Sequence, residues 1–408
     1  MTRGDKLQTR LFHVSTQDIE DISIAFQQEM AAGLAGQSSR LKMLPSFLKK
    51  PDGNETGTFL ALDFGGTNVR AQVLELLGGG RWRECNRRAY PLKDSQGRFD
   101  YISSETKSEE LFDFLAELVL EVSHGQECSL GFTFSFPCVQ NSVQHAELIG
   151  WTKEIKTAGV EGQDVGRLMK EALIRKGGPR ITPVAIINDT VGTLLTAAYK
   201  NPVATIGAIC GTGHNACYFD PVKGMIINME SGNFATLPFT VYDDQLDGNS
   251  DRPGTQRLEK MVSGRYLGEV VRLAAKDLFD ITAQPYSLST ETVAALIGDY
   301  PSESIGLLQI ENDQKARLKE LAMDIVTRSA KLVTACFLGV LRHVDEQIKN
   351  KHTIAVDGSL YEKMPHYREI IDNTLIEMLG SKAQNIKVGL VKDGSGVGAA
   401  VAAALASK

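Results

Sequence analysis

Two glycine-rich turns in this sequence have the composition of phosphate-binding loops. Gly65-Gly66-Thr67-Asn68 stands between two strand-like segments, and residues 211–215 (GTGHN) repeat the same arrangement further along the chain. Backbone amides that point out of such a turn can hold an anion, and threonine and asparagine side chains add donors. Plain β-hairpins use similar turns, so either turn alone fits both interpretations. Their repetition predicts a duplicated architecture in which both loops bind one phosphate chain.

Two aspartates that follow apolar runs could supply the chemistry of such a site. Asp63 ends the run before the first turn, where a hydrated Mg²⁺ could bridge its carboxylate to a phosphate. Asp189 follows the apolar residues 184–187 and Asn188, and a helix is predicted to begin at about Thr190. At the carboxyl end of a strand, an aspartate can act as a general base toward an attacking hydroxyl. It can equally cap the helix, and Thr190 is a second candidate for the cap.

Hydroxyl residues alternate with large aromatic residues over residues 131–140. Three phenylalanines are expected on one face of this strand, with Thr133 and Ser135 on the other, until Pro137 ends it. The pattern fits a polar cleft above a core, and it also fits an ordinary half-exposed strand. Residues 151–164, which begin WTK and contain two glycines, are a candidate mobile flap.

Helical patterns alternate with these strands. Residues 15–30 form an amphipathic pattern with Ile19, Ile22, Phe26 and Met30 on one face. Residues 108–122 and 165–175 are expected to form two further helices. The second strand of the first hairpin alternates apolar residues with Arg70, Gln72 and Leu74, which predicts one face that is more polar than the other. Hairpins mixed with helices indicate an α/β protein.

Composition and charge indicate a folded protein and argue against several functional classes. The 408 residues are 42% hydrophobic and 23% charged, with a net charge of −6, which suits two or three globular domains. The sequence lacks a run of basic residues that would indicate a nucleic-acid partner, and none of its apolar runs is long enough to span a membrane. The six cysteines lack metal-ligand spacing and suit reduced thiols in a cytoplasmic protein. There is no P-loop, no zinc-type histidine pair, and no kinase catalytic loop to accompany the DFG tripeptide.

Taken in order, these segments resemble the hexokinase family, within the actin-like ATPase-fold superfamily. The shared motifs extend from residues 42–45 to residues 393–396 and thus cover nearly the whole chain. They read DFGGTN, FSFP, WTK, IINDT, GTGxNACY, INME, LEKM followed by SGRYLGE, VDGSLY and DGSGxGAA. One such match arises easily by chance, whereas the ordered series is specific.

The resemblance implies a role for each matching residue. Asp189 corresponds to the catalytic base, Lys153 to a residue that helps hold the sugar or the transferred phosphoryl group, and Asp63 to the aspartate that reaches Mg²⁺ through water. The sugar-contacting positions are Ser135, Thr152, Lys153, Asn188, Asp189, Asn215, Glu230 and Glu259. The ATP-contacting positions are Asp63, Gly65, Gly66, Thr67, Asn68, Arg70, Thr212, Gly213, Gly358, Ser359, Gly394, Ser395 and Gly396. Carboxylates and amides suit a ring of hydroxyls, although Glu230 and Glu259 considered alone also fit exposed surface glutamates.

The resemblance also implies a fold and an activity. Two lobes of an actin-like ATPase (ribonuclease H-like) α/β fold, with duplicated mixed sheets, are expected to flank a cleft. The small lobe would hold residues 60–190 plus 393–408, and the large lobe residues 1–59 plus 191–392. The expected reaction, the first step of glycolysis, transfers the γ-phosphoryl group of Mg·ATP to the 6-hydroxyl of a hexose, with glucose first and mannose or fructose as alternatives. The expected partners are ATP and a hexose, for a monomer or homodimer. A catalytically silent sugar sensor and an actin-like or chaperone ATPase are the alternative classes.

One segment departs from the family pattern. The family usually has MEWGAF where this chain has MESGNF at residues 229–234. Ser231 thus replaces an indole and Asn233 replaces a small apolar residue. The change could loosen Glu230 or admit a bulkier sugar substituent, so substrate preference is expected to differ from plain glucose. The alternative is that the indole packs away from the sugar and its neighbourhood has compensated.

Overall fold

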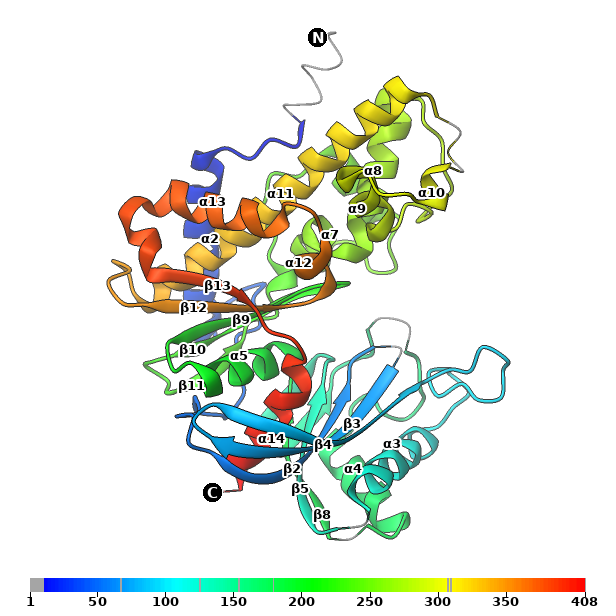
Figure 1. Cartoon of the computed structure of the whole chain (residues 1–408), viewed down its shortest axis with the longest axis vertical. Coiled ribbons are helices and arrows are strands. Elements are labelled where there is room, and N and C mark those ends of the chain that lie inside the picture. Colours follow the sequence, from blue (N-terminus) through cyan, green and yellow to red (C-terminus); the bar gives the residue numbers. More distant parts are fainter. Residues whose placement is uncertain are drawn as a thin grey trace. The chain divides into compact units, whose positions relative to one another are not determined.

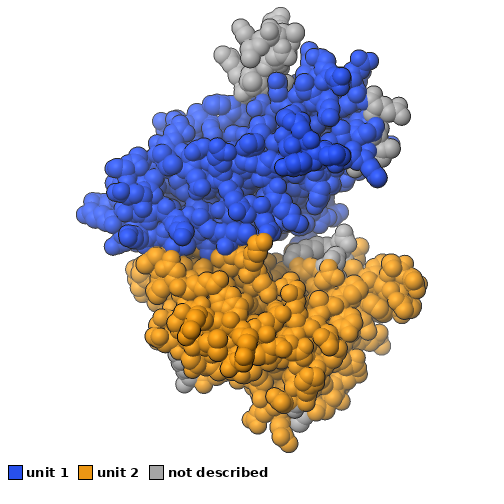
Figure 2. Space-filling model, viewed as in Figure 1, with its two compact units in different colours: residues 1–43, 208–216, 229–390 blue, residues 44–207, 217–228, 391–408 orange. Residues whose placement is uncertain are grey.

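The computed structural model describes residues 11–66, 68–124, 126–152, 155–178, 180–306, 308 and 310–407. The chain divides into two compact units (Figure 2). Unit 1 consists of residues 1–43, 208–216 and 229–390, and unit 2 of residues 44–207, 217–228 and 391–408. The lobe boundaries expected from the family resemblance stay a prediction.

Unit 2 contains a five-stranded sheet. In spatial order its strands are β4 (Arg81–Pro91), β3 (Asn68–Gly78), β2 (Thr56–Phe64), β5 (Cys128–Phe134) and β8 (Ile181–Ile187). The neighbours β4, β3 and β2 are antiparallel, whereas β2, β5 and β8 are parallel. The carboxyl ends of those three parallel strands therefore meet at one edge, which is where ligands bind in α/β sheets.

Helices cover both faces of this sheet. On β5, Leu130 and Phe132 belong to the apolar core with α3 (Ser108–Ser123) and α4 (Val165–Arg175). Gly131, between them, has the opposite orientation: a Cβ atom on it would meet the backbone of α14 (Gly394–Ala406) at Ala399. Helix α14 lies beside α5 (Asp189–Lys200), as Figure 1 shows. Unit 2 also contains a two-stranded sheet of β6 (Cys138–Ser142) and β7 (His145–Leu148).

Two glycines make the contact between α5 and α14 possible. A side chain at Gly398 would collide with the backbone of Gly192, because the helix axes come too close there for a Cβ atom. The small residues of α14 are almost all buried. Residues 394–406 are thus an internal helix that covers a sheet made of much earlier segments.

The second sheet repeats the order of the first. Its strands are β1 (Leu44–Pro45), β11 (Met225–Asn228), β10 (His214–Asp220), β9 (Ala204–Cys210), β12 (His352–Asp357) and β13 (Ile386–Leu390). Strands β10 and β11 are antiparallel, whereas β12 and β13 are parallel. The order β11-β10-β9-β12-β13 corresponds to β4-β3-β2-β5-β8. The predicted α/β class and duplicated architecture are confirmed.

Unit 1 is rich in helices. They are α2 (Thr16–Leu34), α6 (Val241–Gly248), α7 (Arg257–Val262), α8 (Gly264–Phe279), α9 (Thr290–Gly298), α10 (Glu303–Gly306), α11 (Asn312–Val344), α12 (Ser359–Lys363), α13 (Tyr367–Leu379) and the 3₁₀ helices η1 (Ser231–Asn233) and η2 (Gly380–Asn385). Ile19, Ile22, Phe26 and Met30 of α2 are buried as predicted, and Ser15 caps the helix. Helix α2 packs against the long helix α11 (Figure 1). Within the described ranges, no helix has both the length and the apolar character needed to cross a membrane.

Candidate functional site

The first predicted phosphate turn joins β2 to β3. Gly65 and Gly66 lie in the turn, Asn68 is the exposed first residue of β3, and Thr67 lies outside the described residues. Asp63, near the end of β2, is opposite Arg70 in the strand register. Its side chain is 19% exposed. The predicted strand–turn–strand unit is therefore present, with a partly exposed carboxylate at its entrance.

Arg70 connects this carboxylate to the start of α14. Its Nη2 lies 3.9 Å from Asp63 Oδ2, and its Nη1 donates to Asp393 Oδ1. Gln72 Nε2 donates to the other oxygen of Asp393 at 2.9 Å and to Glu84 Oε2 at 2.7 Å. Sequence reasoning assigned no role to Asp393. The sequence feature that could have indicated Asp393 is its position directly before a glycine-rich segment, since Asp63 also lies just before the first glycine turn.

The predicted adenosine-side segment, Gly394 to Gly396, begins α14 and is held by two threonines. Thr133 Oγ1 donates to the carbonyl oxygen of Ser395 at 2.9 Å, and Thr196 Oγ1 donates to that of Gly394 at 2.8 Å. Thr133 is fully buried. It therefore does not line an open polar face, as one interpretation of its strand suggested, because α14 covers that face.

Asn188 and Asp189 follow β8 at the same edge of the sheet. Asn188 caps α5, since its Oδ1 accepts from the Thr190 amide at 3.0 Å and the Thr190 hydroxyl at 2.7 Å. Asp189 is the half-buried first residue of α5, and its Oδ1 accepts from the same amide at 2.8 Å. The cap interpretation was therefore right about the helix end and wrong about the residue.

Ser135 and Thr152 flank an aromatic cluster in unit 2. Strand β5 ends at Phe134, before Pro137, and the Ser135 amide donates to the Phe64 carbonyl at 3.1 Å. Trp151 packs edge-to-face on Phe136, and its indole donates to the Thr157 carbonyl at 2.8 Å. Thr152, the next residue, is half-buried, and Lys153 lies outside the described residues. The predicted flap therefore starts from an anchored tryptophan.

The second predicted phosphate turn joins β9 to β10 and spans residues 211–213. Its carbonyls accept hydrogen bonds from the start of α8: Gly264 N donates to Gly211 O at 2.8 Å and Arg265 N to Thr212 O at 3.1 Å. Gly358 packs against Gly211 with φ +120°, and a Cβ atom there would lie 2.5 Å from the Cys210 carbonyl. Only glycine fits this approach. Thr212, Gly213, Gly358 and Ser359 are thus brought together in unit 1.

The predicted sugar-contacting residues of unit 1 lie beside this turn. Asn215 Nδ2 is 3.5 Å from Glu230 Oε1, and Glu259 Oε2 accepts from the His214 amide at 2.9 Å. Both glutamates are half-buried, so neither is an ordinary surface glutamate. Glu230 has φ 52° and ψ 49°, a left-handed conformation that costs free energy and clusters at ligand sites.

His214 and Cys210 are structural rather than reactive groups. Burial lowers the pKa of His214 to about 4 and raises the pKa of Cys210 to about 12. Burial acts in these directions because it disfavours the charged form of each side chain. Near neutral pH the imidazole and the thiol are therefore both uncharged, with 3.8 Å between His214 Nδ1 and Cys210 Sγ.

A divalent cation would need ligands from a bound phosphate in addition to this chain. No group of three or more histidine, cysteine, aspartate or glutamate residues in the described parts of the chain could hold a metal ion. Mg²⁺ is commonly held by one or two carboxylates, substrate phosphates and water. The partly exposed carboxylate of Asp63 beside the glycine turn fits that arrangement.

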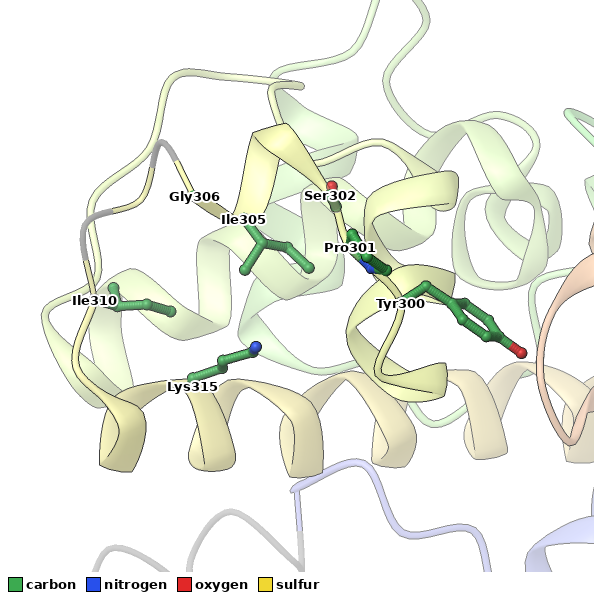
Figure 3. A pocket seen from close by; sticks show the side chains of 7 residues that line it. All are labelled: Tyr300, Pro301, Ser302, Ile305, Gly306, Ile310 and Lys315. Atoms are coloured by element: carbon green, nitrogen blue, oxygen red, sulfur yellow. The ribbon is translucent and has the colours of Figure 1, made fainter.

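A separate cavity of about 410 Å³ lies around α10 in unit 1 (Figure 3). None of the predicted site residues lines it. Its lining consists of Tyr300, Pro301, Ser302, Ile305, Gly306, Ile310 and Lys315.

Comparison with known proteins gives consistent matches along the chain. Two family models, both described as hexokinase, match residues 6–199 and 205–405. Hexokinase-1 of Schizosaccharomyces pombe is 34% identical over 451 residues, which cover 99% of this chain and 90% of that protein. The chain spans about half the length of the mammalian hexokinases that it matches.

Solved structures agree with the sequence matches. A crystal structure of a hexokinase has a TM-score of 0.89 and 34% identity, with 99% of this chain and 98% of that chain covered. A Schistosoma mansoni hexokinase complexed with glucose has a TM-score of 0.85 and 31% identity, with coverage of 99% and 100%.

Proposed function

Since the chain belongs to the hexokinase family, we propose that it transfers the γ-phosphoryl group of Mg·ATP to the 6-hydroxyl of a hexose, with glucose as the first candidate. The observation that carries the proposal is the arrangement at the end of β8. Asn188 is the N-cap of α5, and Asp189, the next residue, accepts from the Thr190 amide through Oδ1. Its carboxylate at the carboxyl end of a parallel strand suits a base that accepts the proton of the attacking hydroxyl.

The hexose is proposed to bind the polar side chains at the sugar-contacting positions. Asn215, Glu230 and Glu259 offer paired donors and acceptors, and Ser135, Thr152, Lys153 and Asn188 are the other proposed contacts. Oxygen and amide groups of this kind match the donor–acceptor pattern of a sugar ring. A fixed set of such groups would orient the 6-hydroxyl toward the phosphoryl group and so lower the entropic part of the barrier.

The nucleotide is proposed to bind the two glycine turns and the segments beside them. Phosphoryl transfer requires positioning and charge neutralisation more than covalent catalysis. The glycine turns at residues 65–66 and 211–213, with the charge of Arg70, suit the phosphates. Gly358-Ser359 and residues 394–396 suit the adenosine. Asp63 would hold Mg²⁺ through water, and the ion would neutralise charge on the phosphates. Closure of the site on the hexose would exclude water as a competing acceptor.

A coupled assay of ADP release tests the proposal. Mg·ATP is combined with glucose, fructose, mannose or glucosamine, for the wild type, Asp189→Ala, and the control Asp313→Ala, which removes an exposed carboxylate. We expect hexose-dependent turnover that falls about 10²- to 10⁴-fold in Asp189→Ala and is unchanged in the control. Saturable hexose binding without turnover would instead support a sugar sensor, and hexose-independent ATP hydrolysis would support an ATPase of another kind.

A further inference from the structure

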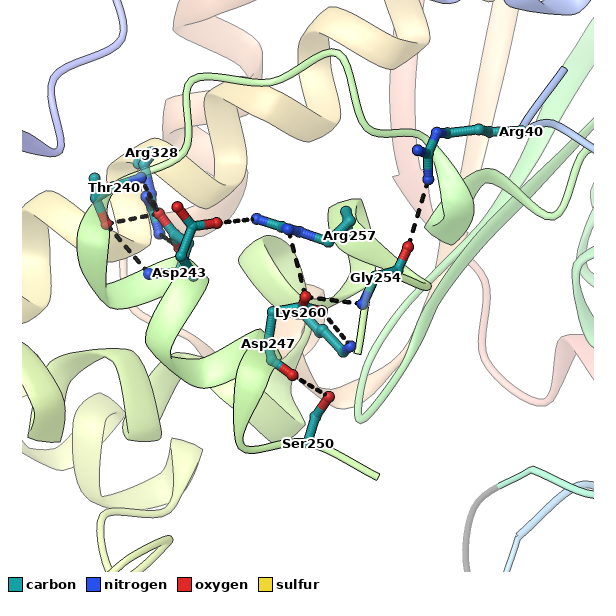
Figure 4. Close-up of polar contacts among 10 residues, drawn as sticks. Arg40, Thr240, Asp243, Asp247, Ser250, Gly254, Arg257, Lys260 and Arg328 are labelled. Carbon is teal, nitrogen blue, oxygen red and sulfur yellow. Dashed lines mark hydrogen bonds and ion pairs between the residues drawn. The ribbon is translucent and has the colours of Figure 1, made fainter. Parts of the chain in front are cut away.

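Lys260, the residue after Glu259 on α7, is buried with its charge paired. Its Nζ lies 2.6 Å from Asp247 Oδ1 on α6 (Figure 4). It also lies 2.8 Å from the carbonyl oxygen of Arg252. Only 4% of Lys260 and 6% of Asp247 is exposed. A buried ammonium group is tolerated only when it is paired and hydrogen-bonded. The pair therefore attaches α7 to α6 at the position next to Glu259.

Asp247 also holds the segment that connects the two helices. Its Oδ2 accepts from the Gly254 amide at 2.8 Å and lies 3.4 Å from Arg257 Nη1. Burial alone would raise the pKa of Asp247, but the hydrogen bonds and charges around it, led by the Lys260 hydrogen bond, lower it. One ionised carboxylate thus fixes both the connection and the start of α7.

Helix α6 is itself anchored to α11 by a second buried ion pair. Asp243, one turn before Asp247, accepts hydrogen bonds from Arg328 at 2.7 and 2.8 Å. Arg328 is 1% exposed and Asp243 3%. Figure 4 shows the two pairs side by side along α6. Contacts therefore run from α11 through α6 to α7.

Helix α7 depends on such an attachment because it is only six residues long. Helices of this length are not stable by themselves in water. Gln256, just before it, has φ 52°, so the chain enters the helix through an unfavourable left-handed conformation. Tertiary contacts must therefore set its position, and with it the position of Glu259 opposite the His214 amide.

We propose that Lys260 and Asp247 form a positioning pair that sets the place of the Glu259 carboxylate for the hexose. The inference rests on the proposed role of Glu259 in hexose binding. Buried ion pairs add little net stability compared with apolar residues of similar volume, so the geometry that this pair imposes is the better explanation for it. A displacement of about 1 Å in a substrate-positioning group can cost on the order of 100-fold in rate.

The test compares Lys260→Met and Asp247→Asn with Glu259→Gln and with a matched control. The control is Arg272→Met, which breaks the Arg272–Glu269 pair on α8, a pair of similar burial in the same unit that leaves α7 untouched. Each variant is measured for Tm, for kcat and KM with glucose and with ATP, and for glucose binding by calorimetry. If Lys260→Met does not fold, Asp247→Asn carries the comparison.

We expect Lys260→Met and Asp247→Asn to lower kcat/KM for the hexose by about 10- to 100-fold with KM for ATP unchanged. Arg272→Met should lower Tm by a similar amount and change kcat/KM less than threefold. In the double variant Glu259→Gln/Lys260→Met, the second change should add little, because Lys260 acts through Glu259.

Two results would overturn the inference. One is a loss in kcat/KM no larger than in Arg272→Met, and the other is full additivity with Glu259→Gln. If Glu259→Gln itself leaves glucose binding intact, or the wild type shows no hexose-dependent turnover, it is the proposed function that fails. The wild type and Glu259→Gln therefore separate that outcome from failure of the positioning role.

Discussion

Arg70 and Asp393 form an ion pair between residues 323 positions apart in the sequence. The pair joins the strand after the first glycine turn to the residue directly before α14, and Arg70 Nη2 also lies 3.9 Å from Asp63 Oδ2. The acidic group proposed to face Mg²⁺ and the segment proposed to face adenosine are thus connected through one guanidinium group. Loss of the connection should affect the nucleotide more than the sugar.

Asp393→Asn removes the charge of this pair and preserves its shape. We expect KM for ATP to rise about fivefold, because a charge-assisted hydrogen bond at a half-exposed site is worth about 1 kcal/mol. KM for the hexose should stay the same. Steady-state kinetics with each substrate varied in turn will measure both values. Arg83→Gln, which removes an exposed pair on the same sheet, is the control, and an unchanged KM for ATP in Asp393→Asn would contradict the assignment.

Arg328→Met should destabilise the protein by about 3–5 kcal/mol, because it leaves the Asp243 carboxylate buried without its partner. Urea unfolding followed by circular dichroism measures the loss. The double variant Arg328→Met/Asp243→Leu removes both charges and should recover a large part of it. A double variant as unstable as the single one would show that packing, rather than the unpaired charge, accounts for the loss.

His214 should make stability depend on pH below neutrality. Its pKa is about 4 in the folded protein, below its ordinary value of 6.5, so the unfolded state binds a proton more tightly. The free energy of unfolding should therefore fall as pH decreases from about 6.5 to about 4, by on the order of 3 kcal/mol. In His214→Leu the free energy of unfolding should depend less on pH over this window. The control His366→Asn, at an exposed site, should keep the slope of the wild type. Equal slopes in the wild type and His214→Leu would refute the prediction.

Ser231 and Asn233 offer a test of sugar preference. Ser231 is fully buried, and its hydroxyl has no hydrogen-bond partner among the residues that the structure describes, while Asn233 Nδ2 donates to the Glu230 carbonyl at 3.2 Å. The double variant Ser231→Trp/Asn233→Ala should shift the ratio of kcat/KM between glucose and glucosamine about tenfold, the scale at which pocket contacts discriminate substrates.

The indole introduced at a buried position can overpack the site. Tm is therefore measured beside the kinetics, and Ser231→Ala/Asn233→Ala, which only removes atoms, is the matched comparison. If both double variants keep the sugar profile of the wild type, Ser231 and Asn233 do not determine specificity.

Local periodicity predicted the elements near the site well. Helix α4 has the predicted bounds, the apolar face of α2 is the predicted one, and both strand–turn–strand units are present. These features depend on residues close in sequence, which is why a pattern with period 2 or 3.6 can reveal them. The ordered motifs added the proposed site residues, which no single pattern indicates, and their roles stay a prediction.

Features that depend on distant segments were not predictable in this way. Gln72 was expected on a polar face but is fully buried, because α14 packs on it at Gly396; Asp393 and Glu84 accept from its amide group. Thr133 is covered for the same reason, since α14 packs on its side of the sheet. The cap of α5 was misassigned by one residue, because asparagine and aspartate cap helices about equally well and only the backbone geometry decides between neighbours.

The packing of α14 has a consequence for biosynthesis. The sheet that this helix covers is complete in sequence at β8, yet Gly131 and Gly192 meet α14 only after residues 394–406 have been translated. During translation, the face of β2 and β5 beneath α14 stays uncovered until α14 has been synthesised. Domains more usually fold as units while the ribosome extends the chain. A nascent chain that stalls before residue 394 would leave this face of the sheet, with Gly131 and Thr133 on it, open to chaperones or to other stalled chains. Synthesis of α14, rather than of the last strand, thus sets the moment when unit 2 can become stable.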